Sequence, residues 1–368
     1  MIENKISSPY YILIILLGYI VLKYIYKPAI TSTVQFSNHR NKYGICVILL
    51  MCIFAVQDTD YFHYETALSA MAQGAILHFE DAYYTIGDIV QYNYLLFRFV
   101  VWGSALCFFL VTVKRLNVPI AMVLFFFVTM YLTKFSYARA SLAMAIGLFG
   151  FSFVIKPIRW RFVSYVIGVS VIATSLLFHK SAIFMVPIYL LSLFRMNRYT
   201  ICISVILFPL GFYLISEYGI ALLFEASDAD LIAESAQGYL MKDSHKSGVA
   251  VLILQFLSRT PYYIFLFVMV KGIIDKLYTI IPIYQRAIVN VSIYVISFAS
   301  LFLFDYSVNT TVMYYRFLYY SILPLSIVIP ILFNMKKYSK ILKFSCTMGF
   351  YAVLYEILYS FYNAYLSA

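Results

Sequence analysis

Two stretches decide how this chain folds: FSYARASLAMAIGLFG at residues 135–150 and LLFHKSAIF at residues 176–184. Each puts ionisable groups at the head of an apolar helix, Arg139 in the first and His179 with Lys180 in the second. A charge at the edge of a membrane span is costly, by roughly 2.5 to 3.5 kcal/mol on insertion scales, and commonly marks a substrate path. The two stretches therefore predict membrane helices that carry a site where membrane meets water.

The composition excludes a soluble globular protein. Of the 368 residues, 63% are apolar and the mean hydropathy is +0.87, which leaves too little polar side chain to cover a soluble surface. The formal charge of +11 does not indicate a nucleic-acid partner, because the basic residues are scattered between apolar runs. The five cysteines lie inside apolar runs without metal-ligand spacing. We therefore expect no disulfide and no structural metal.

Apolar runs of about 20 residues, the length that crosses a bilayer, predict an all-α polytopic membrane protein. About twelve such helices would form one integral membrane domain over residues 1–368. The runs lie at residues 10–26, 43–57, 92–113, 117–134, 138–155, 160–178, 180–194, 199–216, 249–271, 283–304, 312–333 and 341–365. The sequence leaves open whether the ninth run is one helix or two, because Arg259, Thr260 and Pro261 interrupt it.

Charges separate between alternate loops. Most of the 27 basic residues fall on the side of the loop at residues 27–42, together with one acid, Asp275. The positive-inside rule makes that side cytoplasmic, so both termini and the loops at residues 58–91 and 217–248 are expected to be external. In the first external loop, apolar residues at helical spacing predict a helix on the outer membrane surface. These residues are Tyr61, Tyr64, Leu68, Met71 and Ala75.

Six cations lie in or beside the outer halves of the predicted spans, and they need anionic partners. They are Arg98, Lys134, Arg139, Lys180, Arg259 and Arg316. For Arg98 and Lys134 we expect acids or lipid headgroups, whereas Arg259, near the middle of its run, should face a cavity or a partner. Guanidinium groups bind phosphate oxygens in bidentate fashion. We therefore interpret Arg139, Arg259, Arg316 and Lys180 as ligands of a lipid-borne diphosphate lining one outward-facing cavity.

Two residues are candidates for a general base. His179 is external, and histidine exchanges protons near neutral pH, although it suits a helix cap with Ser181 equally well. Asp60 closes an Asp58-Thr59-Asp60 string of the kind that holds a metal in enzymes using nucleotide sugars, but those donors are absent outside the cytoplasm. Asp60 remains a candidate base beside the alternatives of a metal ligand and a solvated acid. We assign no metal and no cofactor.

The order of these residues resembles the EpsG family of Wzy-like polysaccharide polymerases. The resemblance rests on Asp60 with Tyr64, on Arg139 opening an alanine-rich run, on Phe-His-x-Ser-Ala at residues 178–182 and on Tyr-Arg-x-x-x-Tyr at residues 315–320. It covers residues 55–335 and matches Arg139, His179 and Arg316 to the family pattern, whereas Lys180 and Arg259 rest on the charge argument alone.

The resemblance implies a bundle like that of the GT-C class with an outward-facing cavity, in the cytoplasmic (inner) membrane of a bacterium. It implies undecaprenyl-diphosphate-linked oligosaccharides as substrates, joined on the outer face into O-antigen, capsule or exopolysaccharide. Membrane lipid, a polysaccharide chain-length regulator and a flippase would be the other partners.

Two classes of function remain open. In a glycosyltransferase, one sugar leaves its diphosphate lipid and a hydroxyl of another unit captures it, with His179 or Asp60 taking the proton. A flippase or transporter of lipid-linked oligosaccharides also needs cations, but it should carry charge along both halves of its path and often has inverted repeats. Within enzymes, the sequence does not separate a polymerase from a ligase that moves finished glycan to a different acceptor.

Overall fold

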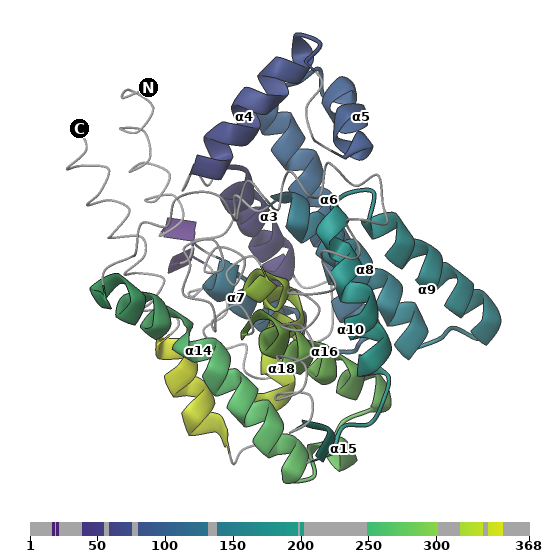
Figure 1. Cartoon of the computed structure of the whole chain (residues 1–368), viewed down its shortest axis with the longest axis vertical. Coiled ribbons are helices and arrows are strands. Elements are labelled where there is room, and N and C mark those ends of the chain that lie inside the picture. Colours follow the sequence, from purple (N-terminus) through teal and green to yellow (C-terminus); the bar gives the residue numbers. More distant parts are fainter. Residues whose placement is uncertain are drawn as a thin grey trace, which may run out of the picture.

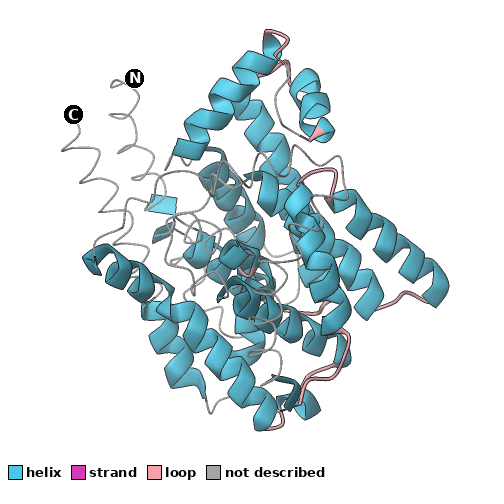
Figure 2. Ribbon diagram, viewed as in Figure 1, coloured by secondary structure: helices cyan, strands magenta, loops and turns pink. Residues whose placement is uncertain are grey.

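The computed structural model describes residues 17–18, 20–21, 39–54, 59–75, 80–131, 138–197, 199–201, 249–300, 317–333 and 338–348. These residues are helical apart from turns and short connections, and they contain no strand (Figure 2). The all-α class predicted from the sequence is confirmed. The helices are α3 (His39–Phe54), α4 (Thr59–Ala72), α5 (Asp81–Ile89), α6 (Tyr94–Arg115), α7 (Ile120–Tyr131), α8 (Ala138–Ile155), α9 (Arg161–Ser175), the 3-10 helix η1 (Lys180–Phe184), α10 (Met185–Ser192), α14 (Val249–Ile274), α15 (Leu277–Ile280), α16 (Ile283–Ser300) and α18 (Ile322–Phe333).

Two of the described helices, α6 and α8, are long and apolar enough to cross a membrane, and several shorter helices are apolar as well. The predicted run at residues 138–155 coincides with α8, and the run at 180–194 corresponds to η1 with α10. The apolar helices support a membrane protein. The number of spans and the side of each terminus stay predictions. The runs at 10–26, 199–216 and 341–365 and the loop at 217–248 lie wholly or largely outside the described residues.

Helix α8 packs against α9 and α6 (Figure 1). The contact with α9 is close because glycines face each other: a Cβ added to Gly150 would lie 2.7 Å from the backbone oxygen of Gly168. Without side chains at these positions the two backbones can approach, which is how many membrane helices associate. The short connection at residues 156–160 makes α9 run antiparallel to α8. The end of α9, and the segment at 176–179 that follows it, therefore return to the level where α8 begins.

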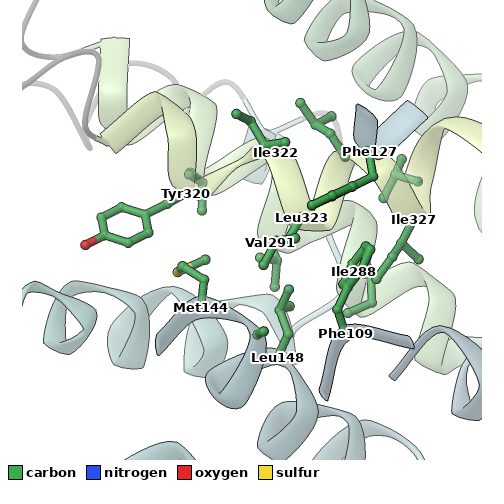
Figure 3. Close-up of a cluster of buried hydrophobic side chains, with 14 of the residues drawn as sticks. Phe109, Phe127, Met144, Leu148, Ile288, Val291, Tyr320, Ile322, Leu323 and Ile327 are labelled. Carbon is green, nitrogen blue, oxygen red and sulfur yellow. The ribbon is translucent and has the colours of Figure 1, made fainter. Parts of the chain in front are cut away.

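A shared core holds the bundle together. Buried side chains from most of the described helices meet in it, among them Phe109 of α6, Phe127 of α7, Leu148 of α8, Ile288 of α16 and Ile327 of α18 (Figure 3). Between membrane helices such contacts act through van der Waals packing, because lipid tails are as apolar as the side chains themselves. This packing fixes the positions of the helix ends that carry the ionisable residues.

The segment at residues 58–91, predicted to be external, contains two helices, α4 and α5, which lie at one end of the molecule in Figure 1, with α15 at the opposite end. The sequence predicted one helix reaching Ala75, but α4 ends at Ala72. Gly74 has a positive φ of 83°, and the N–H of Ala75 donates to the carbonyl of Ala70 at 3.0 Å. This left-handed residue terminates the helix, as glycine commonly does.

The end of the bundle opposite α4 and α5 is tied by reciprocal bonds. Arg115 donates from Nη2 to the carbonyl of Lys156 at 2.8 Å, and Lys156 donates from Nζ to the carbonyl of Arg115 at 2.5 Å. Because these residues end α6 and follow α8, the two helices run parallel. The starts of α6 and α8, with Arg98 and Arg139, therefore lie together at the other end.

The surroundings of Arg98 differ from the acids or lipid headgroups that the sequence predicted. Arg98 is 1% exposed and donates from Nε to the carbonyl of Ile53 at 2.9 Å and from Nη2 to that of Cys52. It therefore does not reach lipid headgroups; the carbonyls at the end of α3, which lack helical partners, attract the cation instead.

Pro261 does not split the ninth run, because α14 continues through it as one helix.

Candidate functional site

Arg139 lies in the first turn of α8 and brings α4 and α5 together around its guanidinium. Its Nη1 donates to Glu80 Oε2 at 2.9 Å, and its Nη2 donates to the hydroxyl of Tyr64 at 3.1 Å. The guanidinium carbon lies 4.7 Å from the centre of the Tyr64 ring and 5.6 Å from that of Tyr83. Aromatic faces attract a cation at such distances. The side chain keeps 18% of its surface exposed.

His179 follows α9 and directly precedes η1. It occupies the N-cap position of η1 in extended backbone, but its side chain makes no capping hydrogen bond. The ring nitrogen Nδ1 instead lies 3.2 Å from Glu80 Oε1. The side chain is 27% exposed. The sequence left open whether His179 caps a helix or acts as a reactive imidazole. In the structure its side chain does not cap η1.

Glu80 joins these groups. Its Oε1 also accepts from the backbone N–H of Lys180 at 3.2 Å, so both carboxylate oxygens are engaged while only 10% of the side chain is exposed. Burial by itself would raise the pKa of Glu80, but the hydrogen bond with His179 and the charge of Arg139 outweigh burial and lower the pKa to about 2. Glu80 is therefore a carboxylate at any pH near neutrality.

A cavity of about 10 Å³ opens beside Arg139, with room for about one water. It is lined by Tyr64, Leu68, Met71, Tyr83, Phe97 and Arg139. A space of this size does not hold a sugar, so the large outward-facing cavity stays a prediction.

Tyr320 brings a further part of the chain to this site. Its hydroxyl points away from the apolar core (Figure 3) and is hydrogen-bonded to Ser181 Oγ. Phe184, at the end of η1, packs edge-on against Phe317 with ring centres 5.2 Å apart. Tyr320 is the last residue of the Tyr-Arg-x-x-x-Tyr string. The described end of that string therefore lies against η1, next to His179 and Lys180.

The other predicted site residues are placed only in part. The backbone of Asp60 belongs to α4, but its side chain lies outside what the structure describes, as does Arg316 altogether. Lys180 is exposed and contributes its backbone N–H to the site. Arg259 is partly buried in α14, which packs against α16 and α18, and it is not among the residues that line the cavity beside Arg139.

The EpsG family model matches residues 41–367. The chain belongs to the EpsG family. This match confirms the resemblance, and every motif behind it falls inside the matched range. The family consists of Wzy-like polysaccharide polymerase-related proteins, so this EpsG protein has a role in polysaccharide biosynthesis. Comparison with curated proteins and with solved structures gave no match.

Sequence reasoning missed Glu80 in this EpsG protein. It predicted that the outer cations need anionic partners, and the Arg139–Glu80 pair shows one such partner. The acids of the loop at residues 58–91 are chemically alike in sequence, so none stood out. The available signal was position, because Glu80 immediately precedes a short amphipathic helix, α5, where the loop returns toward α6.

Proposed function

We propose that this EpsG family member is a glycosyltransferase that polymerises oligosaccharide repeat units carried on undecaprenyl diphosphate. The reaction would take place on the external face of the bacterial cytoplasmic membrane. The observation that carries the proposal is the meeting of Arg139 and His179 on Glu80 at one end of an apolar bundle. A proton acceptor beside cations at the end of membrane helices suits a substrate whose lipid lies in the bilayer and whose diphosphate and sugar lie outside it.

In the proposed reaction, a hydroxyl oxygen of the acceptor unit bonds to the anomeric carbon of the donor unit. Its proton passes to Nε2 of His179. The bond between the anomeric carbon and the diphosphate oxygen breaks, and the electron pair leaves with the lipid diphosphate. Because the leaving group is already attached, the reaction needs no nucleotide. Positioned cations stabilise the charge that develops on the diphosphate, each by a few kcal/mol.

The cations would divide this work unequally. Glu80 neutralises Arg139 in the ion pair, so the net positive charge beside His179 comes from the exposed ammonium of Lys180. Arg139 contributes through the exposed part of its guanidinium, and Arg259 and Arg316 complete the diphosphate site in the proposal. Asp60 remains the alternative base. Glu80 does not compete for that role, since a carboxylate with a pKa of about 2 is too weak a base.

Purified protein in lipid nanodiscs, given its lipid-linked repeat unit and no nucleotide, should produce a ladder of polymer. His179→Ala should leave donor binding nearly intact and lower turnover by roughly 100 to 10,000 fold, the usual contribution of a general base. Asp60→Asn is the matched test of the alternative, since it preserves shape and removes only the basic oxygen.

Other outcomes would change the assignment of the base or of the function. An inactive Asp60→Asn with an active His179→Ala would move the base to Asp60. Activity in both variants, with loss in Arg139 and Arg316 variants, would favour a flippase that binds diphosphate without acid–base chemistry. Transfer of the whole glycan to a foreign acceptor without a ladder would identify a ligase.

A further inference from the structure

Three groups from two separate parts of the chain hold Glu80. Arg139 reaches it from α8, the imidazole of His179 from the segment after α9, and the backbone N–H of Lys180 from the start of η1. All three distances lie between 2.9 and 3.2 Å. The Glu80 carboxylate is bound on both oxygens and its side chain is only 10% exposed, so its orientation is fixed. It therefore also fixes the orientations of Arg139 and His179.

Another ion pair in the described part of the chain is longer and more exposed. Lys271 and Asp275 form an i,i+4 pair on α14 and the turn after it, at 3.8 Å, with 45% and 22% of their side chains exposed. Such a pair contributes little, because water and salt screen it. The pair of Glu80 and Arg139 is shorter and less exposed, and an imidazole shares the carboxylate. Tyr338 also donates to Asp275, but the third partner of Glu80 is an imidazole, a group that can take up and release a proton.

The contact through Nδ1 settles which ring nitrogen of His179 is free. A carboxylate accepts hydrogen bonds, so the neutral imidazole carries its proton on Nδ1, between the ring and Glu80. The lone pair then sits on Nε2, the nitrogen turned away from Glu80. When Nε2 takes a proton, the same carboxylate stabilises the imidazolium that forms, as acids do behind histidine in hydrolytic triads.

We infer that Glu80 is the positioning residue of the proposed glycosyl transfer. Its carboxylate holds the His179 imidazole with Nε2 presented to the acceptor hydroxyl and keeps Arg139 alongside. This inference rests on the proposed function. Glu80 touches neither the sugar nor the diphosphate, and it acts through His179.

Glu80→Gln keeps the length and shape of the side chain but removes the charge. We expect kcat to fall by about 100 fold or more, because the amide presents the ring with either tautomer, while KM for the lipid-linked donor changes little. Glu80→Asp, which keeps the charge, should restore part of kcat.

The charged and titratable groups around the pair must be held constant in this comparison. They are Arg139 from α8, Tyr64 from α4, Tyr83 from α5, Lys180 from η1 and Tyr320. The matched control is Asp81→Asn, which removes the neighbouring acid, exposed in the first turn of α5, and should leave kcat unchanged. Thermal unfolding of every variant checks that the protein folds.

A readout without turnover separates this inference from the proposed function. The chain has five histidines, and ¹⁵N NMR of imidazole-labelled protein, assigned with His179→Gln, reports the tautomer directly. We expect the Nδ1–H form of His179 in the wild type and a mixture in Glu80→Gln.

If the tautomer changes as expected but no polymer ladder forms, the proposed polymerase function is wrong, whereas the positioning role of Glu80 is supported. A normal ladder with Glu80→Gln at full kcat and an unchanged His179 tautomer would overturn the positioning role alone. Tighter binding of pyrophosphate by Glu80→Gln, with kcat unchanged, would also overturn it, because Glu80 would then be a competitor for the substrate's phosphate.

Discussion

At the scale of single residues, Glu80 keeps a charge in a place where burial opposes it. Its pKa, ordinarily 4.5, is lowered to about 2 because bonding to His179 and Arg139 outweighs burial. A carboxyl group whose pKa is lower in the folded state stabilises the fold above its ordinary pKa, and that contribution is lost as pH falls from about 4.5 toward 2.

Glu80→Gln should therefore lower the unfolding temperature at pH 7, and the difference from wild type should shrink toward pH 3. The lost contribution is about 3 kcal/mol at most, from the pKa shift at 1.36 kcal/mol per unit. Thermal unfolding in detergent at the two pH values measures it. A difference that stays constant with pH would show that packing, and not the ionised carboxylate, accounts for the loss.

The sequence located Arg139 and His179 because charges at the ends of apolar runs are rare and costly. It did not locate Glu80, because several acids share one polar loop and only packing of α5 selects among them. For His179, the sequence left open a helix cap or a base; the side chain makes no capping bond to η1 and contacts Glu80, a residue 99 positions away, and its role as a base stays a prediction. A contact with a residue so distant along the chain cannot be predicted from the sequence around His179.

At the scale of elements, the contact between α8 and α9 sets the site, because α9 leads directly to His179. A methyl group added at Gly150 would lie 2.7 Å from the Gly168 oxygen and 2.8 Å from the Ile172 nitrogen, both backbone atoms that cannot rotate away. Gly150→Ala should force the helices apart, destabilise the protein by roughly 1 to 3 kcal/mol, and lower turnover by displacing His179.

Gly103→Ala in α6 is the matched control, since its added Cβ meets nothing within 4 Å. It should be neutral or slightly stabilising, because alanine is the better helix former. Unfolding temperature and turnover are measured for both variants. Equal behaviour of the two would mean that α9 is not seated on α8 at these glycines.

The sequence predicted the position of α8 well because its apolar run is bounded by residues that end it on both sides. It predicted less well where one residue overrides a pattern. Gly74 ended α4 before the apolar spacing did, through its positive φ. Pro261 did not break α14, even though proline removes a helical donor; prolines are tolerated in membrane helices more often than in soluble ones.

At the scale of the whole molecule, the described acid Glu80 and its cationic partners lie at one end of the bundle and a second group of cations lies at the other. Glu80, Arg139 and His179 lie at the end where α8 begins, whereas Arg115 and Lys156 lie where α6 and α8 finish. Gln285 at the start of α16 donates to the carbonyl of Leu116 at 3.1 Å, which brings Arg286 to that same end. Hydropathy alone predicts apolar helices, but the separation by end depends on how α6 and α8 align.

The positive-inside rule predicts that the end with Arg115 and Lys156 is cytoplasmic and the end with Glu80 is external. In a cysteine-free background, a membrane-impermeant maleimide added to intact cells should label Asp81→Cys. It should label Arg159→Cys only after the membrane is opened; both positions are exposed. The reverse pattern would place the site in the cytoplasm, where nucleotide sugars are available. The argument for a donor that carries its own diphosphate leaving group would then lose its basis, even if the contacts of Glu80 were unchanged.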